Sequence, residues 1–512
     1  MSVRHDVVVI GSGNAGFSAA LAAREMGASV LLLEKAGADW VGGNSYFTAG
    51  AFRTTFSGLH DLLPVLDEVD EERLARTELP AYSVEDFRAD MLRVTQGRCD
   101  PVLTSVLVEE AADTIQWLHD QGLRFRLMYD RQSFEVNGTF RFWGGLVLGT
   151  VGGGKGLIDH YLGAAAAHEI EVQYDSPLVG LVQDASGAVT GVTYRAPDGV
   201  HPAAGGSKSL RQVDAGAVIL AAGGFEANPQ LRAAYLGPGW DLAKVRGTPY
   251  NTGEVLHMAL ALGAQPYGHW SGCHAVAWDA AAPPSGDRVL TNLYTKQSYP
   301  IGIVVNREAR RFIDEGADFR NYTYARYGAE ILKQPEALAY QLFDAKTVPL
   351  LRRDEYTAPG VSRFEAMTVR ELAMKIGLDP DALATTIAEF NAAVQEGVFN
   401  PAIKDGKHTS GISPRKSNWA QPLDTPPYYA FAVTCGITYT FGGLKIDGEG
   451  QVLDRVGAPI EGLYAAGELV GGLFYHNYPG GSGLMAGSVF GRRAGRSAAA
   501  RARTRQPGRA RA

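Results

Sequence analysis

The sequence has little cysteine, and its three cysteines lie far apart. Cys99, Cys273 and Cys435 show neither a C-x-x-C pair nor the Cys/His spacing of a metal site. That pattern argues against an iron–sulfur cluster, a zinc site or a disulfide framework, so we expect no metal and a reducing compartment. No apolar run approaches the roughly 20 residues that span a bilayer, and a strand opens almost at Met1. We therefore expect a cytoplasmic protein with no signal peptide and no direct membrane insertion.

Charged residues are also modest in number, at 20%, and the formal net charge of −7 gives no reason to expect a nucleic-acid partner. Glycine, by contrast, is abundant, with 62 residues in 512. Glycine permits close approach of backbone to backbone or to a ligand, which suits a nucleotide-binding protein. A chain of this length is expected to form two domains that share an interface.

The pattern along the chain starts with DVVVIGSGNAGFSAALAAREMGASVLLLEK. It predicts a buried strand over residues 6–11, a helix rich in alanine that ends at Gly27, and a second strand that ends at Glu34. Continuous apolar strands of this kind occur in parallel sheets that are covered on both faces. We expect an α/β fold, α+β overall, with a Rossmann-like cofactor domain at its centre.

Gly11, Gly13 and Gly16 form G-x-G-x-x-G between that strand and that helix. The first glycine allows a tight turn, the second lets a pyrophosphate approach the backbone, and the third lets helix and strand pack. The helix N-terminus favours the negative charge, and Glu34 is placed to accept hydrogen bonds from ribose hydroxyls. This unit predicts a dinucleotide site without separating FAD from NAD.

Further segments favour FAD. Gly42 to Ser45, GGNS, follow the acidic strand and offer backbone and hydroxyl donors where an NAD site would ordinarily continue into a helix. A simple turn is the alternative. AAGGF at 221–225 and GLYAAGELVGG at 462–472 each close a strand, and a last helix is predicted to start at Ser482 with its N-terminus near the cofactor.

Between these segments the chain changes character. Residues 175–222 alternate in the strand period and predict a small antiparallel meander that returns to the main sheet. Residues 270–436 are richer in proline, aromatic residues and helical stretches, which indicates an inserted α+β capping domain. We expect the cofactor domain to comprise residues 1–269 and 437–495, followed by a basic, disordered tail over 496–512.

Taken together, these segments resemble the flavoprotein family of fumarate reductases, succinate dehydrogenases and 3-ketosteroid dehydrogenases, over nearly the whole chain. GGGKGL at 152–157 also matches a flavin-domain segment of that family. The resemblance implies a glutathione-reductase-type FAD-binding fold and a contact between Glu468 and the ribitol of FAD. The residues that we expect at the cofactor are Gly11, Gly13, Asn14, Ala15, Gly16, Glu34, Lys35, Gly42, Gly43, Asn44, Ser45, Gly153, Gly154, Val179, Ala222, Gly223, Gly467, Glu468, Ser482, Gly483 and Leu484.

Within the family, RQSFEVNGTFRFWGGL, SGCHA and YHNYPGGSGLMAGSVFGR look most like the tricarballylate dehydrogenases. The resemblance implies hydride transfer between a substrate carbon and flavin N5, with Arg320 handling the proton on the adjacent carbon. Arginine holds its proton tightly, so this role requires neighbouring carboxylates and exclusion of water, and Glu315 and Asp318 are candidate partners. An interdomain salt bridge is the structural alternative. His274 matches a histidine that binds a substrate carboxylate, or is a buried core residue.

The sequence departs from fumarate reductases at two places. Thr438 stands where those enzymes have a histidine, with Tyr439 beside it, and Tyr478 stands where they have an arginine that clamps a carboxylate. Tyrosine at that position is closer to the ketosteroid enzymes. Arg131 and Arg141 could supply the charge that a tricarboxylate needs, or could be solvated surface residues. Tyr439 and Tyr478 orient the substrate or pack.

We therefore expect an FAD-dependent dehydrogenase of a small polycarboxylate, with tricarballylate to cis-aconitate as the best match. A steroid-like or other enone substrate, a fumarate-reductase-like activity and a non-catalytic flavin carrier are the alternatives. With no cluster ligands in the chain, electrons are expected to leave to a separate acceptor, and the resemblance implies an iron–sulfur membrane protein. From Arg492 onward there are eight arginines and no acid, so the tail could assist such docking.

Overall fold

The computed structural model describes residues 4–197 and 208–504. Its central element is an eight-stranded sheet with the path β10-β2-β1-β13-β12-β11, in which β21 also pairs with β13 and β20 pairs with β21. Its strands are β1 (Arg4–Ile10), β2 (Val30–Leu33), β10 (Glu171–Gln173), β11 (Leu178–Gln183), β12 (Val189–Pro197), β13 (Lys208–Leu220), β20 (Gln451–Leu453) and β21 (Pro459–Ala465).

The expected β-α-β unit and meander are both present. β1 pairs in parallel with β2 and with β13, and β13 pairs in parallel with β21. β11 and β12 form the antiparallel meander, which returns to the main sheet through β13. Because β1, β13 and β21 run in the same direction, their carboxyl ends meet at one edge, where ligands bind in such sheets.

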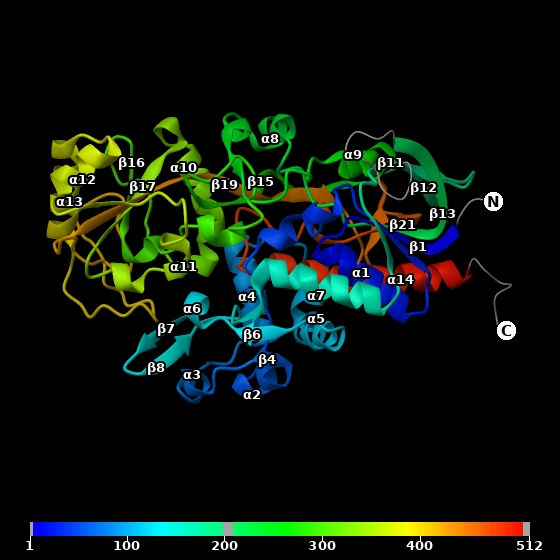
Figure 1. Cartoon of the computed structure of the whole chain (residues 1–512), viewed down its shortest axis with the longest axis horizontal. Coiled ribbons are helices and arrows are strands. Elements are labelled where there is room, and N and C mark those ends of the chain that lie inside the picture. Colours follow the sequence, from blue (N-terminus) through cyan, green and yellow to red (C-terminus); the bar gives the residue numbers. More distant parts are fainter. Residues whose placement is uncertain (1–3, 198–207, 505–512) are drawn as a thin grey trace.

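Two helices from opposite ends of the chain pack together on this sheet. α1 (Asn14–Glu25) lies beside α14 (Ser482–Thr504), blue and red in Figure 1, with α7 (Gly153–Ala167) and α5 (Pro101–Asp120) next to them. Glycines allow the close approach: a Cβ at Gly491 would lie 2.6 Å from Ala15 O, and one at Gly495 would lie 2.3 Å from Ala19 O. The last helix starts at Ser482, as expected.

The end of α14 corrects one expectation. Residues 496–504 were expected to belong to a disordered tail, but they continue the helix. Arg496 pairs with Glu25, and Arg501 pairs with Glu461 and donates to Gly216 O. These contacts, together with buried alanines on the inner face of the helix, hold the segment on the sheet. Residues 505–512 lie outside the described part of the chain.

A second region, seen on the left of Figure 1, is built on a six-stranded sheet with the path β14-β19-β17-β16, with β15 and β18 also paired to β19. Its strands are β14 (Lys244–Val245), β15 (Pro266–Asp279), β16 (Ile303–Asn306), β17 (Ala339–Asp344), β18 (Phe364–Ala366) and β19 (Tyr428–Leu444). Its helices are α10 (Tyr324–Leu332), α11 (Arg353–Tyr356), α12 (Val369–Ile376) and α13 (Pro380–Ala393), while α8 (Pro229–Leu236) and α9 (Glu254–Ala261) precede β15.

Long strands β15 and β19 join this region to the cofactor region. They pair antiparallel from Pro266 opposite Leu444 to Asp279 opposite Val433. The expected domain boundaries, at 269/270 and 436/437, both fall inside these strands. The division into domains at those residues stays a prediction, and the paired strands on which it falls also carry site residues.

A smaller lobe lies below both regions in Figure 1. It contains a four-stranded sheet, β3-β9-β6-β4, and a three-stranded sheet, β5-β8-β7. Its elements are β3 (Ala51–Phe52), β4 (Leu66–Glu68), β5 (Thr77–Glu78), β6 (Phe125–Leu127), β7 (Ser133–Val136), β8 (Thr139–Phe142) and β9 (Leu148–Thr150), with helices α2 (Leu59–Leu62), α3 (Glu71–Ala75), α4 (Val84–Val94) and α6 (Tyr129–Gln132).

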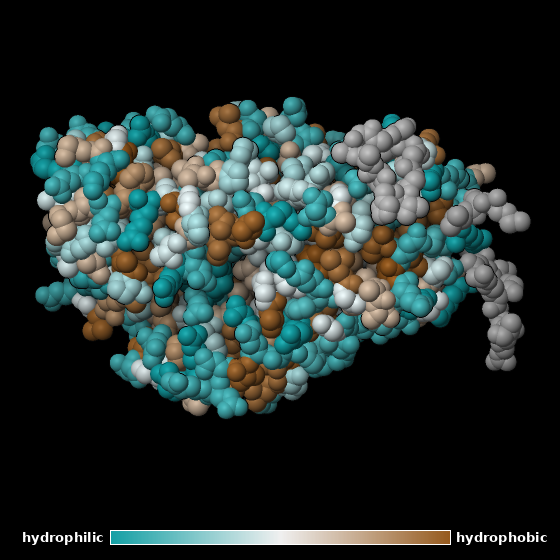
Figure 2. Space-filling model, in the orientation of Figure 1, coloured by the Kyte–Doolittle hydropathy of each residue, from teal (hydrophilic) through white to brown (hydrophobic). Residues whose placement is uncertain are grey.

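The visible face of the molecule is largely hydrophilic, with small, separate apolar groups (Figure 2). No helix within residues 4–197 and 208–504 is both long and apolar enough to cross a membrane. In the same residues there is no group of three or more His, Cys, Asp and Glu side chains placed to hold a metal ion.

Candidate active site

One continuous cavity runs from the carboxyl edge of the main sheet to the cap. In its first half, the turn between β1 and α1 is shaped by glycine. Gly11 has a φ of +103°, and a Cβ there would lie 2.5 Å from Ala221 O, while a Cβ at Gly16 would lie 1.9 Å from Gly11 O. At Gly13 the nearest atom to such a Cβ is Ser45 Oγ, at 3.6 Å. Gly11 and Gly16 are thus required by the packing of the chain, whereas Gly13 keeps the cavity open.

Glu34 follows β2 and is buried at the cavity wall. Its Oε2 accepts hydrogen bonds from Ser12 N at 2.9 Å and Ser12 Oγ at 2.6 Å, and its Oε1 accepts from Ala36 N at 2.7 Å. The carboxylate therefore fixes the glycine turn against the end of the second strand. A carboxylate has about four lone-pair sites, so capacity remains for a ligand hydroxyl.

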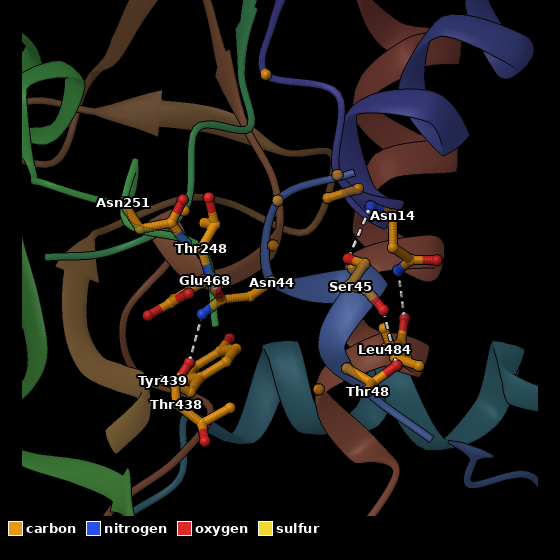
Figure 3. Close-up of a pocket in the computed structure, with 18 of the residues that line it drawn as sticks. Asn14, Asn44, Ser45, Thr48, Thr248, Asn251, Thr438, Tyr439, Glu468 and Leu484 are labelled. Carbon is orange, nitrogen blue, oxygen red and sulfur yellow. Dashed lines mark hydrogen bonds between the residues drawn. The ribbon is translucent and has the colours of Figure 1, made fainter. Parts of the chain in front are cut away.

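Asn14 connects three separate segments at this turn, as Figure 3 shows. Its backbone N donates to Ser45 Oγ at 3.0 Å, and its side-chain Nδ2 donates to Leu484 O at 2.8 Å. Its Oδ1 accepts from Tyr161 and Ser488 hydroxyls. The GGNS loop and the start of α14 are thereby held at the N-terminus of α1.

The segments after β13 and β21 complete this half. Because Leu220 lies opposite Ala465 in parallel strands, the segment 221–223 and the Gly467–Glu468 segment leave the sheet side by side. Glu468 lines the cavity, and its Oε1 accepts from Thr440 N at 2.7 Å. The N-terminal end of α14 also reaches the wall at Gly483 and Leu484.

Most residues expected at the cofactor line this cavity. Those that do are Gly11, Gly13, Asn14, Ala15, Glu34, Lys35, Gly43, Asn44, Ser45, Ala222, Gly223, Gly467, Glu468, Gly483 and Leu484. Gly16, Gly42, Gly153, Gly154 and Ser482 lie behind the wall, where a Cβ at Gly42 would meet Ile158 at 2.5 Å and one at Gly154 would meet Tyr46 O at 2.5 Å. Val179 is 40% exposed on β11 and does not line the cavity.

The second half of the cavity is lined by charged and aromatic side chains. Of the residues expected there, Arg131, His274, Arg320, Thr438, Tyr439 and Tyr478 are present. His274 and Tyr439 are opposite one another in the β15–β19 pair. Arg141 is not brought to the cavity: it pairs with Glu78 at 2.9 Å on β8, and its side chain is 41% exposed.

Arg320 is buried, and its guanidinium lies 5.4 Å from the ring centre of Trp143. Its Nε has no hydrogen-bond partner among the described residues. Burial lowers the pKa of this guanidinium well below its usual value, and Arg352 and Arg131 lower it further, while Glu355 acts in the opposite direction. Arg320 is therefore a cation whose proton is held less tightly than in water.

The acid near Arg320 differs from those expected. Glu315 pairs with Arg311 at 2.5 Å, and Asp318 pairs with Arg93 at 2.5 Å. Each carboxylate has its own cation, so neither is the partner of Arg320. The nearby acid is instead Glu355 of α11, about 35 residues further along the chain.

Glu355 is fully buried between two arginines of the cavity wall. Its Oε1 lies 2.8 Å from Arg131 Nη2 and 2.9 Å from Arg352 Nη1. Burial alone would raise its pKa, but Arg352 and Arg131 lower the pKa to about 2. Arg352 also donates to Gln297 Oε1 at 2.6 Å and to Arg131 O at 2.8 Å. This one carboxylate is shared by two arginines that come from different lobes.

Arg246 is a further buried arginine of the cavity wall, and it has only neutral partners. Its Nη1 donates to Thr438 Oγ1 at 3.0 Å, and its Nε donates to Asn292 Oδ1 at 3.1 Å. It forms no ion pair within the described residues. Burial lowers its pKa, while the hydroxyls of Tyr324 and Tyr478 raise it. Glu355 also raises its pKa, but no carboxylate within the described residues is in contact with this buried cation.

His274 and two tyrosines lie around this charge. The His274 Nε2 is buried without a partner among the described residues, and burial, followed by Arg246, lowers the pKa of the ring well below its usual value. Its ring centre lies 5.0 Å from that of Tyr324 and 4.7 Å from that of Tyr478. The hydroxyls of Tyr324 and Tyr478 are 2.7 Å apart. A neutral imidazole can donate one hydrogen bond into the cavity.

Comparisons with known proteins show the family to which the chain belongs. A family model described as an FAD binding domain matches residues 6–484. A probable fumarate reductase of Shewanella frigidimarina is 30% identical over 505 residues, which cover 96% of this chain and 74% of the relative. A urocanate reductase of Eggerthella lenta is 30% identical over 513 residues, covering 97% of this chain and 74% of that protein.

Among solved structures, the open conformation of a flavocytochrome c3 fumarate reductase superposes with a TM-score of 0.70 at 28% identity. It covers 98% of this chain and 79% of the other. The chain belongs to the FAD-binding flavoprotein family that includes the fumarate reductases, and it is an FAD-dependent oxidoreductase that acts on CH–CH bonds.

Proposed function

We propose that the enzyme dehydrogenates a small polycarboxylate at a CH–CH bond, and that tricarballylate, converted to cis-aconitate, is the substrate. The observation that carries the proposal is the charge of the second half of the cavity. Arg131, Arg246, Arg320 and Arg352 line it, and among the described residues the carboxylate paired with any of them is that of Glu355, which contacts Arg131 and Arg352. Three positive charges remain, and burying them is costly unless an anion binds.

The first half fits FAD. A Cβ at Gly13 would point into space that the protein leaves open, as the approach of a pyrophosphate requires. We assign the pyrophosphate to the turn at Gly11–Gly13 and to the N-terminus of α1, and the ribose to Glu34. Asn44, Ser45 and Glu468 would hold the remainder of the cofactor. FAD, when bound, supplies the acceptor for a hydride from the substrate carbon.

Protein side chains then account for the other steps. Arg246 binds one carboxylate of the substrate, and the neutral His274 donates a hydrogen bond to another. Arg320 handles the proton on the carbon adjacent to the one that loses hydride, since burial and neighbouring cations make its neutral form more accessible. Tyr439 and Tyr478 orient the carbon skeleton. Arg352 and Glu355 set the electrostatic surroundings of Arg320.

A ketone or enone substrate is the second candidate, because Tyr478 stands where the resembling fumarate reductases carry an arginine. Its hydroxyl pairs with that of Tyr324 and could polarise a carbonyl. The unpaired Arg246 favours an anion instead. The named relatives support a carboxylate too, since fumarate and urocanate both carry that group.

Anaerobic mixing of the FAD-loaded protein with tricarballylate, succinate and a 3-ketosteroid tests the proposal. We expect tricarballylate to bleach the flavin absorbance fastest, and we expect cis-aconitate to restore it in protein that has been reduced chemically. Bleaching by the 3-ketosteroid with no response to either carboxylate would replace the proposal by the second candidate.

Electrons must then leave the reduced protein. Within the described residues, no group of side chains is placed to hold a metal ion. We propose that a separate acceptor, an iron–sulfur or other membrane-bound redox protein, receives the electrons. Turnover coupled to a membrane fraction, compared between the full chain and a chain ending at Thr504, tests whether residues 505–512 assist docking. Equal rates would remove the tail from the proposal. The cytoplasmic location also stays a prediction.

A further inference from the structure

Two buried glutamates from different segments meet beside the first half of the cavity. Glu226 follows the AAGGF segment and is 0% exposed, while Glu468 follows β21 and is 8% exposed at the cavity wall. Gly224 makes their approach possible, because a Cβ there would lie 2.3 Å from Glu468 Oε1 and 2.1 Å from Thr440 Oγ1. The two carboxyl groups interact through their side chains, and this interaction raises the pKa of Glu468 while its hydrogen bond lowers that of Glu226.

The donors around the pair are unevenly distributed. Asn44 Nδ2 and Asn251 Nδ2 both donate to Glu226 Oε1, at 2.5 Å and 2.6 Å, and Thr440 donates its N–H and hydroxyl to Glu468 Oε1. The other oxygen of Glu226, Oε2, is buried with no hydrogen-bond partner in the described residues. Figure 3 shows Asn44, Asn251 and Glu468 together on one side of the cavity, away from Asn14 and Ser45.

Neither carboxylate forms an ion pair in the described part of the chain. Arg232 is the nearby arginine and attracts Glu226 electrostatically, but its hydrogen bonds go to the backbone oxygens of Glu226, Trp240, Asp241 and Ala243. The other titratable neighbours are Cys273, Cys435 and Tyr439, and burial raises the pKa of all three, so they are neutral. Burial also raises the pKa of both glutamates, and for Glu468 the neighbouring Glu226 adds to this. Two uncompensated carboxylates cannot both be ionised in such a place, so one proton is shared.

We propose that Glu468 carries this proton and donates it toward Oε2 of Glu226, and that Glu226 takes up a second proton from solvent when the bound FAD is reduced. The role differs from that of the residues assigned to the substrate. Hydride transfer brings two electrons and one proton to FAD and leaves it with one more negative charge. Proton uptake by the adjacent pair compensates that charge, so reduction consumes two protons for two electrons.

The stoichiometry has a direct readout. A tenfold change in equilibrium constant corresponds to 29.6 mV for a two-electron couple, so two protons give about −59 mV per pH unit and one proton about −30 mV. Glu226→Gln is the informative variant. Its amide oxygen can accept from Asn44 and Asn251, so it imitates the protonated Glu226 of the reduced state without being able to titrate.

We therefore expect the flavin midpoint potential of the wild type, titrated spectroscopically between pH 7 and 9, to change by about −59 mV per pH unit, and that of Glu226→Gln by about −30 mV. Glu461→Gln, an exposed glutamate on β21, is the matched control and should keep the wild-type slope. A wild-type slope near −30 mV, or an unchanged slope in Glu226→Gln, overturns the proposal.

Infrared spectroscopy tests the resting proton separately from the redox step and from the choice of substrate. The oxidised wild type should show the C=O stretch of a buried, protonated carboxylic acid at pH 7, and Glu468→Gln should lack it. Persistence of that band in Glu468→Gln, or its absence from the wild type, contradicts the assignment of the proton to Glu468. If a variant fails to fold, the carboxylic-acid band and the pH slope of the midpoint potential in the wild type still test the proposal.

Discussion

The half of the cavity that faces the main sheet is lined chiefly by glycine, small residues and backbone amides, whereas the half that faces the cap is lined by arginine, tyrosine and histidine side chains. In the first half the carboxylate of Glu34 is satisfied by Ser12 and Ala36. In the second half, Arg246 and Arg320 form no ion pair with an acid within residues 4–197 and 208–504. A site that is complete in itself suits a resident cofactor, and a site with uncompensated charge suits a substrate that comes and goes.

Replacing Arg320 is expected to affect the second half of the cavity most strongly while leaving the first half unchanged. We expect Arg320→Ala to keep bound FAD but to slow bleaching by tricarballylate about 1000-fold, within the range for loss of a general acid or base. Stopped-flow absorbance measures the rate. Arg310→Ala, an exposed arginine on a neighbouring turn, should behave as wild type. Bleaching of Arg320→Ala at the normal rate would remove the residue from the mechanism.

The ionisation of Glu355, in the second half of the cavity, makes the stability of the fold depend on pH. Its folded pKa of about 2 lies below the ordinary 4.5, so it stabilises the fold above pH 4.5 and loses that contribution as pH falls toward 2. We expect Glu355→Gln to lower the free energy of unfolding by about 3 kcal/mol at pH 7. Urea unfolding from pH 7 to 3 should show the difference shrinking with acid. A difference that stays constant would show that Glu355 is not ionised against the arginines.

Gly13→Val tests the first half alone. A Cβ there lies in the cavity at ordinary contact distance from Ser45 Oγ and Gly42 O, so we expect a folded protein that binds FAD about 30-fold more weakly, from about 2 kcal/mol of overpacking. Flavin fluorescence titration gives the dissociation constant. Gly16→Val is the contrasting variant and should fail to fold, because its side chain meets Gly11 O. Tight FAD binding by Gly13→Val would contradict the assignment of the pyrophosphate to this turn.

Two arginines from one sequence segment can also be compared, with a smaller expected effect. Arg131 pairs with Glu355 at the cavity, whereas Arg141 pairs with Glu78 outside it. We expect Arg131→Ala to raise the KM for tricarballylate about tenfold and Arg141→Ala to leave it unchanged. Steady-state kinetics with an artificial electron acceptor measures both. Equal effects would show that the lobe carrying both arginines acts as one unit.

The first half of the cavity could be predicted from the sequence because its residues lie in short motifs. The turn at Gly11–Gly16, the acid at Glu34 and the helix that starts at Ser482 each depend on local backbone requirements. Val179 was the exception: nothing in a strand position shows which way its side chain points. The helical end of α14 was missed since arginine-rich composition indicates disorder, while its buried alanines pack on the sheet.

The second half could be predicted only in part. Arg320 and His274 were found through a resemblance. The predicted acid partners of Arg320 were wrong, because Glu315 and Asp318 are close to it in sequence but pair with other arginines. Arg246, Arg352 and Glu355 were missed. They carry no motif and meet only through the packing of β14, α11 and α6. An arginine directly after a short strand, as in KVRG, was the one local signal for Arg246.

The central claim is that substrate carboxylates neutralise the arginines of the second half. Binding of tricarballylate, glutarate and butyrate, which carry three, two and one carboxylates, to oxidised holoenzyme tests it most directly through the shift of the flavin spectrum. We expect affinity to fall with each carboxylate removed, and Arg246→Met to bind tricarballylate at least about tenfold more weakly while keeping FAD. Equal affinity for the three acids, with no effect of Arg246→Met, would contradict the account.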